Sequence, residues 1–363
     1  MIEILTGDCQ DILPTLPSKS VQCCVTSPPY WGLRDYGTAL WEGGDAQCDH
    51  KRFNGYPTGL HGRCYAQDNG KFFKDLCPKC GANRIDSQLG LEESPELYIT
   101  KMVAVFREVW RVLKDDGTLW LNLGDSYAGS WSGNSMRPDG GTQRVGVPGF
   151  QPLDSRYTGR NGTVPLGLKP KDLCMIPARL AMALQADGWY LRSEIVWHKP
   201  NPMPESVTDR PTKSHEMIYL LAKQERYFYV ADAIREPHSE PWRGKGEHET
   251  DNPIFSKNRL AEGISWTPAI RQYNAAGRNK RSVWTVATQP YDGAHFATFP
   301  EEIPKLCILA GSRSGDTVLD PFAGSGTTGK VAIELGRRAI LIELSPAYVR
   351  LARERTNVTP GWF

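Results

Sequence analysis

Three glycines near the end of the chain have a spacing that suits the binding of a nucleoside. In TVLDPFAGSGTTGKVAIELGRRAILIELS, residues 317–345, Gly324, Gly326 and Gly329 form a G-x-G-x-x-G pattern. Glycine permits a sharp turn and lets a ligand lie against the backbone at the N-terminus of the following helix. Glu343 closes the next strand, where an acidic side chain would bind the two hydroxyls of a ribose. The alternative is a tight structural turn between strand and helix.

The position of this unit along the chain adds information. Only about twenty residues follow Glu343, so the remaining strands of the sheet must come from earlier in the sequence. A nicotinamide enzyme usually opens its sheet with such a unit. Because the unit comes last here, an NAD-dependent oxidoreductase is the weaker alternative.

A second chemically distinctive stretch is TSPPYW, residues 26–31, directly after the apolar segment VQCCV. SVQCCVT predicts a buried strand that ends at a proline. Two consecutive prolines fix the backbone at the strand end, and Tyr30 offers an aromatic face. The structural alternative is a proline-stopped strand with an aromatic plug.

Cysteine and histidine residues in an insertion between Tyr36 and Ser94 predict a metal site. CPKCGA at 77–82 has the form of a zinc knuckle, since two thiolates two residues apart can reach one ion and the glycine relieves the turn. The expected ligands are Cys48, His50, Cys77 and Cys80. His61 and Cys64 are the reserve pair, which would leave Cys48 and His50 as loop residues. A closed four-ligand site is structural and does no catalysis.

The elements that hold these residues alternate between helix and strand. Residues 94–117 predict a helix, with Ser94 as N-cap, Pro95 in the first turn and Gly117 as the stop, followed by the strand TLWLNLG. Residues 175–197 predict a helix closed by Gly188 and then a strand. Residues 215–223 predict a further strand and residues 299–311 a helix. A strand, helix, strand order predicts a parallel sheet.

The composition of the 363 residues is that of an ordinary globular protein, with room for one large domain with insertions or for two domains. No run approaches the roughly 20 apolar residues that span a bilayer, and the N-terminus lacks the layout of a signal peptide. We therefore expect a cytoplasmic protein. Its nine cysteines are expected to be thiols or metal ligands rather than disulfides, with core thiols at Cys9, Cys23, Cys24, Cys174 and Cys307.

Basic residues gather in two polar regions, although the net charge of +2 is too mild to indicate a nucleic-acid partner. The first is a glycine-rich stretch from Gly129 to Gly167, and the second runs from about Ile234 to Val283 and interleaves arginine with tryptophan. Either could be a solvated surface or a DNA contact. The predicted DNA contacts are Arg271, Arg278, Lys280 and Arg281.

DPFAGSGTTG late, TSPPYW early and a variable basic region between them together resemble the amino-methylating DNA methyltransferases of the permuted beta class. The resemblance spans nearly the whole chain outside two insertions. It implies a circularly permuted, Rossmann-like α/β fold with a mostly parallel sheet. It also implies S-adenosylmethionine as methyl donor, double-stranded DNA as partner, and a place in restriction and modification. The oligomeric state is left open, a homodimer included.

The resemblance assigns roles to particular residues. Asp8 in GDCQDIL would meet the adenine of the cofactor, although it could also be a turn residue after a short strand. Thr298 and Pro300 in HFATFPEEI would lie beside the methionine moiety, and Glu343 would bind the ribose hydroxyls. The loop that holds the cofactor would comprise Asp320, Pro321, Phe322, Ala323, Gly324, Ser325 and Gly326.

The resemblance also explains the prolines. An exocyclic amine of cytosine or adenine is a poor nucleophile because its lone pair is delocalised into the ring. Ser27 and the carbonyl of Pro28 can accept its two N–H bonds from out-of-plane directions, which localises the lone pair and aims it at the sulfonium methyl. Pro28 and Pro29 fix these acceptors, and Tyr30 stacks on the extruded base. No covalent enzyme intermediate is required.

Serine at position 27 favours one target base, since SPPY is most often found in N4-cytosine enzymes of this family and DPPY in N6-adenine enzymes. N6-adenine methylation is therefore the first alternative. Methylation of RNA or of a protein amide is a weaker one, and a catalytically silent DNA-binding module is another. His198 and Lys199 are expected in a loop near the target base.

This interpretation depends on one spatial prediction. The proline pair and the glycine turn must meet across neighbouring strand ends, with a gap that fits one methyl group. The predicted segments are the core at 1–37, 94–127 and 171–233, the zinc-binding insertion at 38–93, the glycine-rich loop at 128–170, the target-recognition region at 234–290 and the cofactor-binding part of the core at 291–363.

Overall fold

The computed structural model describes residues 1–32, 39–50, 76–85, 88–128, 167–238, 277–289 and 299–357. Most of the predicted glycine-rich loop and of the predicted target-recognition region lies outside these ranges. None of the described helices combines the length and the apolar character that crossing a bilayer requires.

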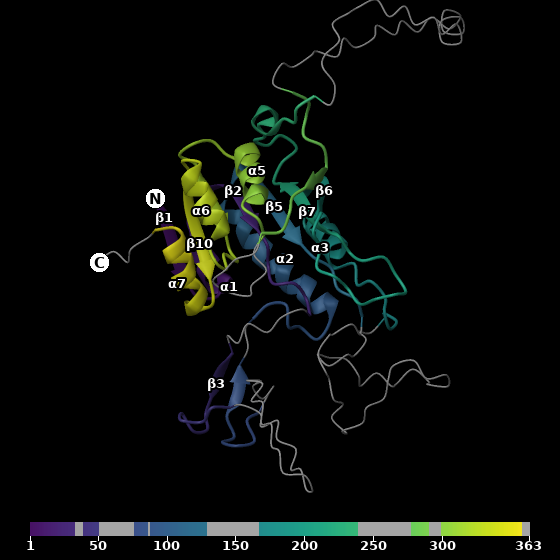
Figure 1. The fold of residues 1–363 in the computed structure, drawn as a ribbon. Helices are drawn as coiled ribbons and strands as arrows, with labels where there is room; N and C mark the ends of the chain where they lie inside the picture. The colour runs from purple at the N-terminus through teal and green to yellow at the C-terminus, as the bar shows by residue number, and fades with distance from the viewer. Residues whose placement is uncertain are drawn as a thin grey trace, which may run out of the picture.

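One central sheet organises the described part of the chain (Figure 1). Its strands lie in the order β1-β10-β9-β2-β5-β7-β6-β8. Neighbouring strands are parallel except where β7 meets β5 and β6. Their bounds are β1 Ile2–Thr6, β2 Val21–Thr26, β5 Leu113–Leu123, β6 Tyr190–His198, β7 His215–Ala222, β8 Val283–Thr285, β9 Thr317–Asp320 and β10 Arg338–Glu343. The predicted mostly parallel sheet is confirmed, and the unit predicted from residues 317–345 supplies β9 and β10.

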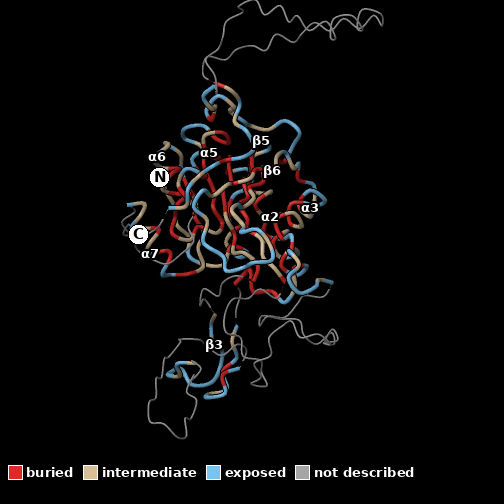
Figure 2. The backbone as a smooth tube through the Cα atoms, turned by 45° about the vertical axis from the view of Figure 1, so that its right-hand side comes forward, coloured by how far each residue is buried: buried red, intermediate tan, exposed pale blue. Residues whose placement is uncertain are grey.

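Helices cover both faces of this sheet. They are α1 Cys9–Ile12, α2 Pro95–Val112, α3 Ile176–Ala186, α5 Glu302–Gly311, α6 Thr327–Glu334 and α7 Pro346–Arg355, with 3-10 turns at Leu13–Thr15 and Ala231–Ile234. Alternate strand residues face the two layers: Cys24 and Leu121 pack with α2 and α3, whereas Cys23 and Trp120 pack with α5 and α6. Buried residues accordingly concentrate in and beside the central strands (Figure 2).

The helix predicted from residues 94–117 is confirmed at its start and wrong at its end. The Ser94 hydroxyl accepts a hydrogen bond from the Leu97 amide, as an N-cap does. The helix ends at Val112, because Leu113 already pairs with Val21 of the neighbouring strand. Gly117 therefore lies within β5 rather than stopping the helix. A Cβ there would lie 2.9 Å from the Lys114 carbonyl, so glycine serves a close backbone approach.

A small antiparallel pair stands apart from the central sheet (Figure 1). It consists of β3, Leu40–Glu42, and β4, Asn83–Ile85, within the predicted zinc-binding insertion.

Candidate active site

The carboxyl ends of β2 and β9 lie side by side. Cys23 and Cys24 pair with Val318 and Leu319 in parallel register. Just beyond this pairing, the Thr26 hydroxyl donates a 2.7 Å hydrogen bond to Asp320. The TSPPYW segment and the glycine loop thus leave the sheet from adjacent strand ends, and that part of the spatial prediction is confirmed.

Asp320 ties the two segments together. Its Oδ1 accepts from the Thr26 hydroxyl and, at 3.1 Å, from the Phe322 amide, and its Oδ2 accepts from the Thr328 hydroxyl at 2.7 Å. The side chain is buried, and burial raises its pKa to about 6 against the hydrogen bonds that oppose the shift. This carboxylate therefore supports the loop from beneath.

The raised pKa of Asp320 predicts a pH-dependent stability. The folded chain holds the proton more tightly than the unfolded chain, so the favourable contribution is complete below about pH 4 and is lost as the pH rises through about 6. Between these limits we expect wild type to lose about 3 kcal/mol of unfolding free energy relative to Asp320→Asn. Urea unfolding across this pH range measures the difference. Parallel stability profiles would contradict the assignment.

The glycine loop holds its first glycine against Glu343. Gly324 adopts a left-handed φ of +52°, and its amide donates to Glu343 Oε2 at 2.8 Å. The Ser345 amide donates to Oε1 of the same carboxylate, also at 2.8 Å. A Cβ at position 324 would meet no atom within 4 Å, so the loop backbone borders open space. Burial raises the pKa of Glu343.

The other glycines and Ser325 serve packing. A Cβ at Gly326 would lie 2.9 Å from Ala352 of α7, and one at Gly329 would lie 2.5 Å from Leu341 of β10. The Ser325 hydroxyl is buried and accepts from Arg355 of α7 at 3.0 Å. Ser325 therefore fastens the loop to α7 and leaves ligand contact to the open side at Gly324.

The remaining predicted cofactor residues lie around this loop. The Gly7 amide donates to the Glu343 carbonyl, which places Asp8 at the same sheet edge. Asp8 also caps α1 by accepting from the Gln10 amide at 2.9 Å. Pro300 is buried at the start of α5, and Thr298 lies outside the described residues.

These residues fit S-adenosylmethionine. The open side of Gly324 lets a ligand approach the backbone, and Glu343 offers further lone pairs to ribose hydroxyls beyond the two amides it already accepts. Asp8 lies at the end of the adjoining strand.

The tyrosine of the TSPPYW segment belongs to a polar network that the sequence did not reveal. The Tyr30 hydroxyl donates to Glu216 Oε2 at 2.6 Å and accepts from the side-chain amide nitrogen Nδ2 of Asn122 at 3.2 Å. Asn122 also donates to Glu216, at 2.9 Å. The Ser27 hydroxyl lies 3.3 Å from that of Tyr30 and donates to it. Ser27 and Tyr30 are thereby held in one arrangement.

Lys199, the residue directly after β6, completes this network. Its ammonium forms an ion pair with Glu216 and lies 4.4 Å from the centre of the Trp197 ring. Because β7 runs antiparallel to β6, Glu216 near the start of β7 reaches the same edge as the end of β6. His198 and Lys199 were predicted in a loop near the target base, but His198 is the last residue of β6 and lies 3.2 Å from the Thr285 hydroxyl of β8. Only Lys199 joins the network around Tyr30, and its nearness to a base stays a prediction.

The prolines are packed closely from outside. The Pro29 carbonyl accepts from the Tyr98 hydroxyl of α2 at 2.9 Å. A Cβ at Gly90 would lie 3.0 Å from the Tyr30 carbonyl, where glycine is the only residue that fits without a shift. The Trp31 indole donates to the Glu92 carbonyl at 3.0 Å. These contacts fix the strand exit that the prolines begin.

Gly124 at the end of β5 is required by the Tyr30 ring. A Cβ there would lie 2.5 Å from Cε2 of Tyr30. We expect Gly124→Ala to lower the unfolding free energy by roughly 1–3 kcal/mol, the usual cost of overpacking. Thermal and urea unfolding measure it. In a Tyr30→Ala background the same substitution should cost much less, and an undiminished cost there would refute the steric explanation.

Two of the predicted DNA-contacting residues are ion-paired within the chain. Arg278 and Lys280 lie 3.2 and 3.4 Å from the two carboxylate oxygens of Glu236. Arg281 lies beside them on an exposed hollow. Arg271 lies outside the described residues.

The predicted metal ligands Cys48, His50, Cys77 and Cys80 come together in the insertion. The reserve pair, His61 and Cys64, lies outside the described residues.

Comparison with known proteins decides the family. The N6/N4 methyltransferase family model, described as DNA methylase, matches residues 21–354. The chain belongs to this DNA methylase family. It is 42% identical over 364 residues to the type II methyltransferase M.Cfr9I of Citrobacter freundii, which covers 98% of this chain and 89% of the relative. It is 40% identical to M.SmaI of Serratia marcescens, with 97% and 90% covered.

A solved structure agrees with the fold of this DNA methylase. The PvuII DNA methyltransferase (cytosine-N4-specific) aligns with a TM-score of 0.55 and 15% identity, over 100% of this chain and 88% of that chain. The family assignment confirms the predicted resemblance and argues against the NAD-dependent oxidoreductase alternative.

Proposed function

We propose that this DNA methylase transfers a methyl group from S-adenosylmethionine to the exocyclic N4 amine of a cytosine turned out of double-stranded DNA. The observation that carries the proposal is the junction of the two motifs at adjacent strand ends, joined by the Thr26–Asp320 hydrogen bond. One motif suits an amine and the other a nucleoside, and transfer requires their ligands within bonding reach. The similarity to type II methyltransferases supports a modification role beside a restriction enzyme.

When bound, S-adenosylmethionine would supply an electrophilic methyl group on a sulfonium. The amine nitrogen would form the new N–C bond as the S–C bond breaks and S-adenosylhomocysteine leaves, and the amine would then lose one proton to water. Glu343 would accept hydrogen bonds from the ribose hydroxyls, and its existing bonds to the Gly324 and Ser345 amides fix the carboxylate for this. Asp8 would contact the adenine, and Phe322 would contact the cofactor from the loop. Asp320 holds the loop to the TSPPYW segment.

The amine is prepared by acceptors at the end of β2. The Ser27 hydroxyl donates to Tyr30, which leaves its oxygen lone pairs free to accept one amine N–H. The Pro28 carbonyl accepts the other. Both acceptors are held before the base arrives, so no reorganisation is needed during transfer.

The base stacks on Tyr30. Its ring is positioned by the hydroxyl bonds to Glu216 and Asn122 and by close packing on Gly124. Stacking and the amine contacts must together offset the few kcal/mol that extruding a base costs. Glu216 and Lys199 act as positioning residues, because they reach the base only through Tyr30.

Serine at position 27 is the reason for proposing cytosine as the target base. SPPY segments are most often found in N4-cytosine members of the family, and DPPY segments in N6-adenine members. A hydroxyl also leaves this position without the negative charge that an aspartate would bring.

Nucleoside analysis tests the proposal. Plasmid DNA is incubated with the purified enzyme and S-adenosylmethionine, digested to nucleosides and analysed by mass spectrometry. We expect N4-methylcytosine, and methylation should require duplex substrate. Detection of N6-methyladenine alone would replace cytosine with the adenine alternative, and transfer only to RNA or protein would overturn DNA as the substrate.

A further inference from the structure

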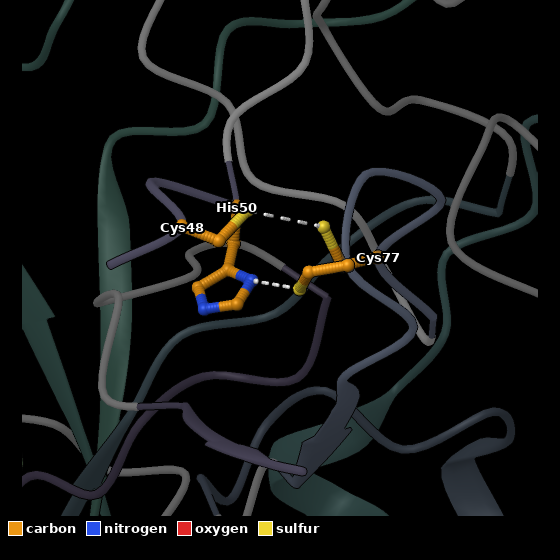
Figure 3. A group of neighbouring side chains, drawn as sticks. Cys48, His50 and Cys77 are labelled. Carbon is orange, nitrogen blue, oxygen red and sulfur yellow. Dashed lines mark hydrogen bonds between the residues drawn. The ribbon is translucent and has the colours of Figure 1, made fainter. Parts of the chain in front are cut away.

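Metal-ligating side chains from two separate segments converge in the insertion that follows the TSPPYW segment. The sulfurs of three cysteines and a ring nitrogen of one histidine lie within 4.8 Å of one another. Figure 3 shows Cys48, His50 and Cys77 directed toward one another. Within the part of the chain that the structure describes, no second group of this kind comes together.

Two of the separations match a tetrahedral zinc site, and all ligand atoms lie within 4.8 Å of one another. With Zn–S near 2.3 Å and Zn–N near 2.0–2.1 Å, tetrahedral geometry separates two sulfurs by about 3.8 Å and a sulfur from a nitrogen by about 3.6 Å. The Cys48 and Cys77 sulfurs lie 3.7 Å apart. The Cys80 sulfur lies 3.5 Å from His50 Nδ1. The three cysteines are free thiols, so no disulfide accounts for their approach.

The backbone around CPKCGA has the turn that such a site needs. The Cys77 amide donates to the Ala82 carbonyl at 2.8 Å, and the Gly81 amide donates to the Cys77 carbonyl at 2.7 Å. Gly81 adopts a left-handed φ of +74°, which closes the turn between the two thiols. The amides of Asp45 and Ala82 hydrogen-bond to the Cys80 sulfur, as they would to a bound thiolate.

The segment that carries Cys48 and His50 packs closely against this turn. Gly44 passes so close that a Cβ would lie 2.8 Å from the Cys80 sulfur. The Trp41 ring stacks on the His50 imidazole, with centroids 4.2 Å apart and planes 10° apart, which orients the histidine. Pairing of β3 with β4 brings both halves together.

We propose that Cys48, His50, Cys77 and Cys80 bind one zinc ion that stabilises this insertion. The small sheet cannot do so by apolar burial. Each strand has three residues, and Leu40 and Ile85 are 73% and 49% exposed. A two-stranded pair of this size is marginal in water, whereas a structural zinc site contributes folding energy directly. With four protein ligands the ion has no open position for a reacting group.

The zinc site is independent of the methyl-transfer machinery, although the insertion begins and ends beside it. The Gly32 amide donates to the Gly90 carbonyl at 2.8 Å, and Trp31 bonds to Glu92. These contacts do not involve the ligands. Loss of the ion should therefore loosen residues 40–50 and 76–85 and leave the central sheet intact.

Metal analysis of the full-length protein tests the proposal. We expect elemental mass spectrometry to find about one zinc ion per chain in wild type. The zinc content should fall at least about tenfold in Cys77→Ser and in Cys80→Ser. It should stay at the wild-type level in Cys174→Ala, which removes a buried thiol outside the cluster. Wild type that carries no zinc, and takes none up from zinc-containing buffer, would overturn the proposal. So would variants that keep the metal.

A second measurement covers variants that fail to fold. Wild type is stripped with a chelator and titrated with cobalt(II), which reports thiolate coordination by its absorption in a tetrahedral site. Hydrogen exchange on the stripped chain should rise in 76–85 and stay unchanged in α2. Absence of the thiolate signal, or unchanged exchange in 76–85, would refute a structural zinc here.

Discussion

Ser27→Ala is expected to lower the rate of methyl transfer roughly 100-fold while S-adenosylmethionine binds as before. The substitution removes one of the two acceptors that localise the amine lone pair, and removal of one preorganised hydrogen bond to a reacting centre costs that much in comparable sites. It also removes a hydrogen bond to Tyr30. Single-turnover transfer with saturating DNA and cofactor measures the chemical step apart from binding.

Ser314→Ala is the matched control for this experiment. Ser314 precedes the N-terminal end of β9, whereas the candidate active site lies at the carboxyl ends of the strands. Its hydroxyl donates to the Gly336 carbonyl. The Ser314→Ala enzyme should transfer methyl groups at the wild-type rate. If Ser27→Ala, and its combination with Tyr30→Ala, transferred methyl groups at the wild-type rate, the SPPY segment would have no catalytic role.

Glu343→Ala is expected to weaken S-adenosylmethionine binding at least about 100-fold. The carboxylate fixes the amides of Gly324 and Ser345, so its loss leaves two donors without their acceptor and removes the partner of the ribose hydroxyls. Hydrogen bonds to a charged group contribute about 1.5–3 kcal/mol each, and two of them account for this factor. Isothermal titration calorimetry measures the affinity directly.

Glu334→Ala is the control for charge removal in the same region. Glu334 ends α6, is largely exposed and lies 3.7 Å from Lys330. Its cofactor affinity should stay at the wild-type level. Circular dichroism of Glu343→Ala must show the native fold, and wild-type affinity in that folded variant would remove Glu343 from the cofactor site.

The backbone of the site follows from local patterns in the sequence. TSPPYW and the glycine unit each combine a buried strand with residues that dictate how the chain leaves it, and parallel strands bring such exits to one edge. The spacing of CPKC predicts the Cys77 and Cys80 pair, whereas the sequence leaves the second pair open between Cys48 with His50 and His61 with Cys64. Local chemistry and element order were sufficient for the two strand exits and for the CPKC pair.

The supporting contacts were not predictable in the same way. Asn122 lies in β5, Glu216 in β7, and Lys199 directly after β6. Their meeting beside Tyr30 depends on the reversed direction of β7, which no local pattern reveals. The end of α2 was misplaced because the pairing of Leu113 with a distant strand outweighs the preference of its neighbours for helix. Long-range contacts decide both.

The strand order has a consequence for synthesis on the ribosome. β1 and β2 are the first strands to emerge, yet β10 and β9 lie between them in the sheet. The edges of β1 and β2 that face these strands therefore stay unpaired until β9 and β10 have been synthesised, and pairing over such sequence separations is slow. We infer that the part of the sheet that joins the TSPPYW segment to the glycine loop forms late in folding.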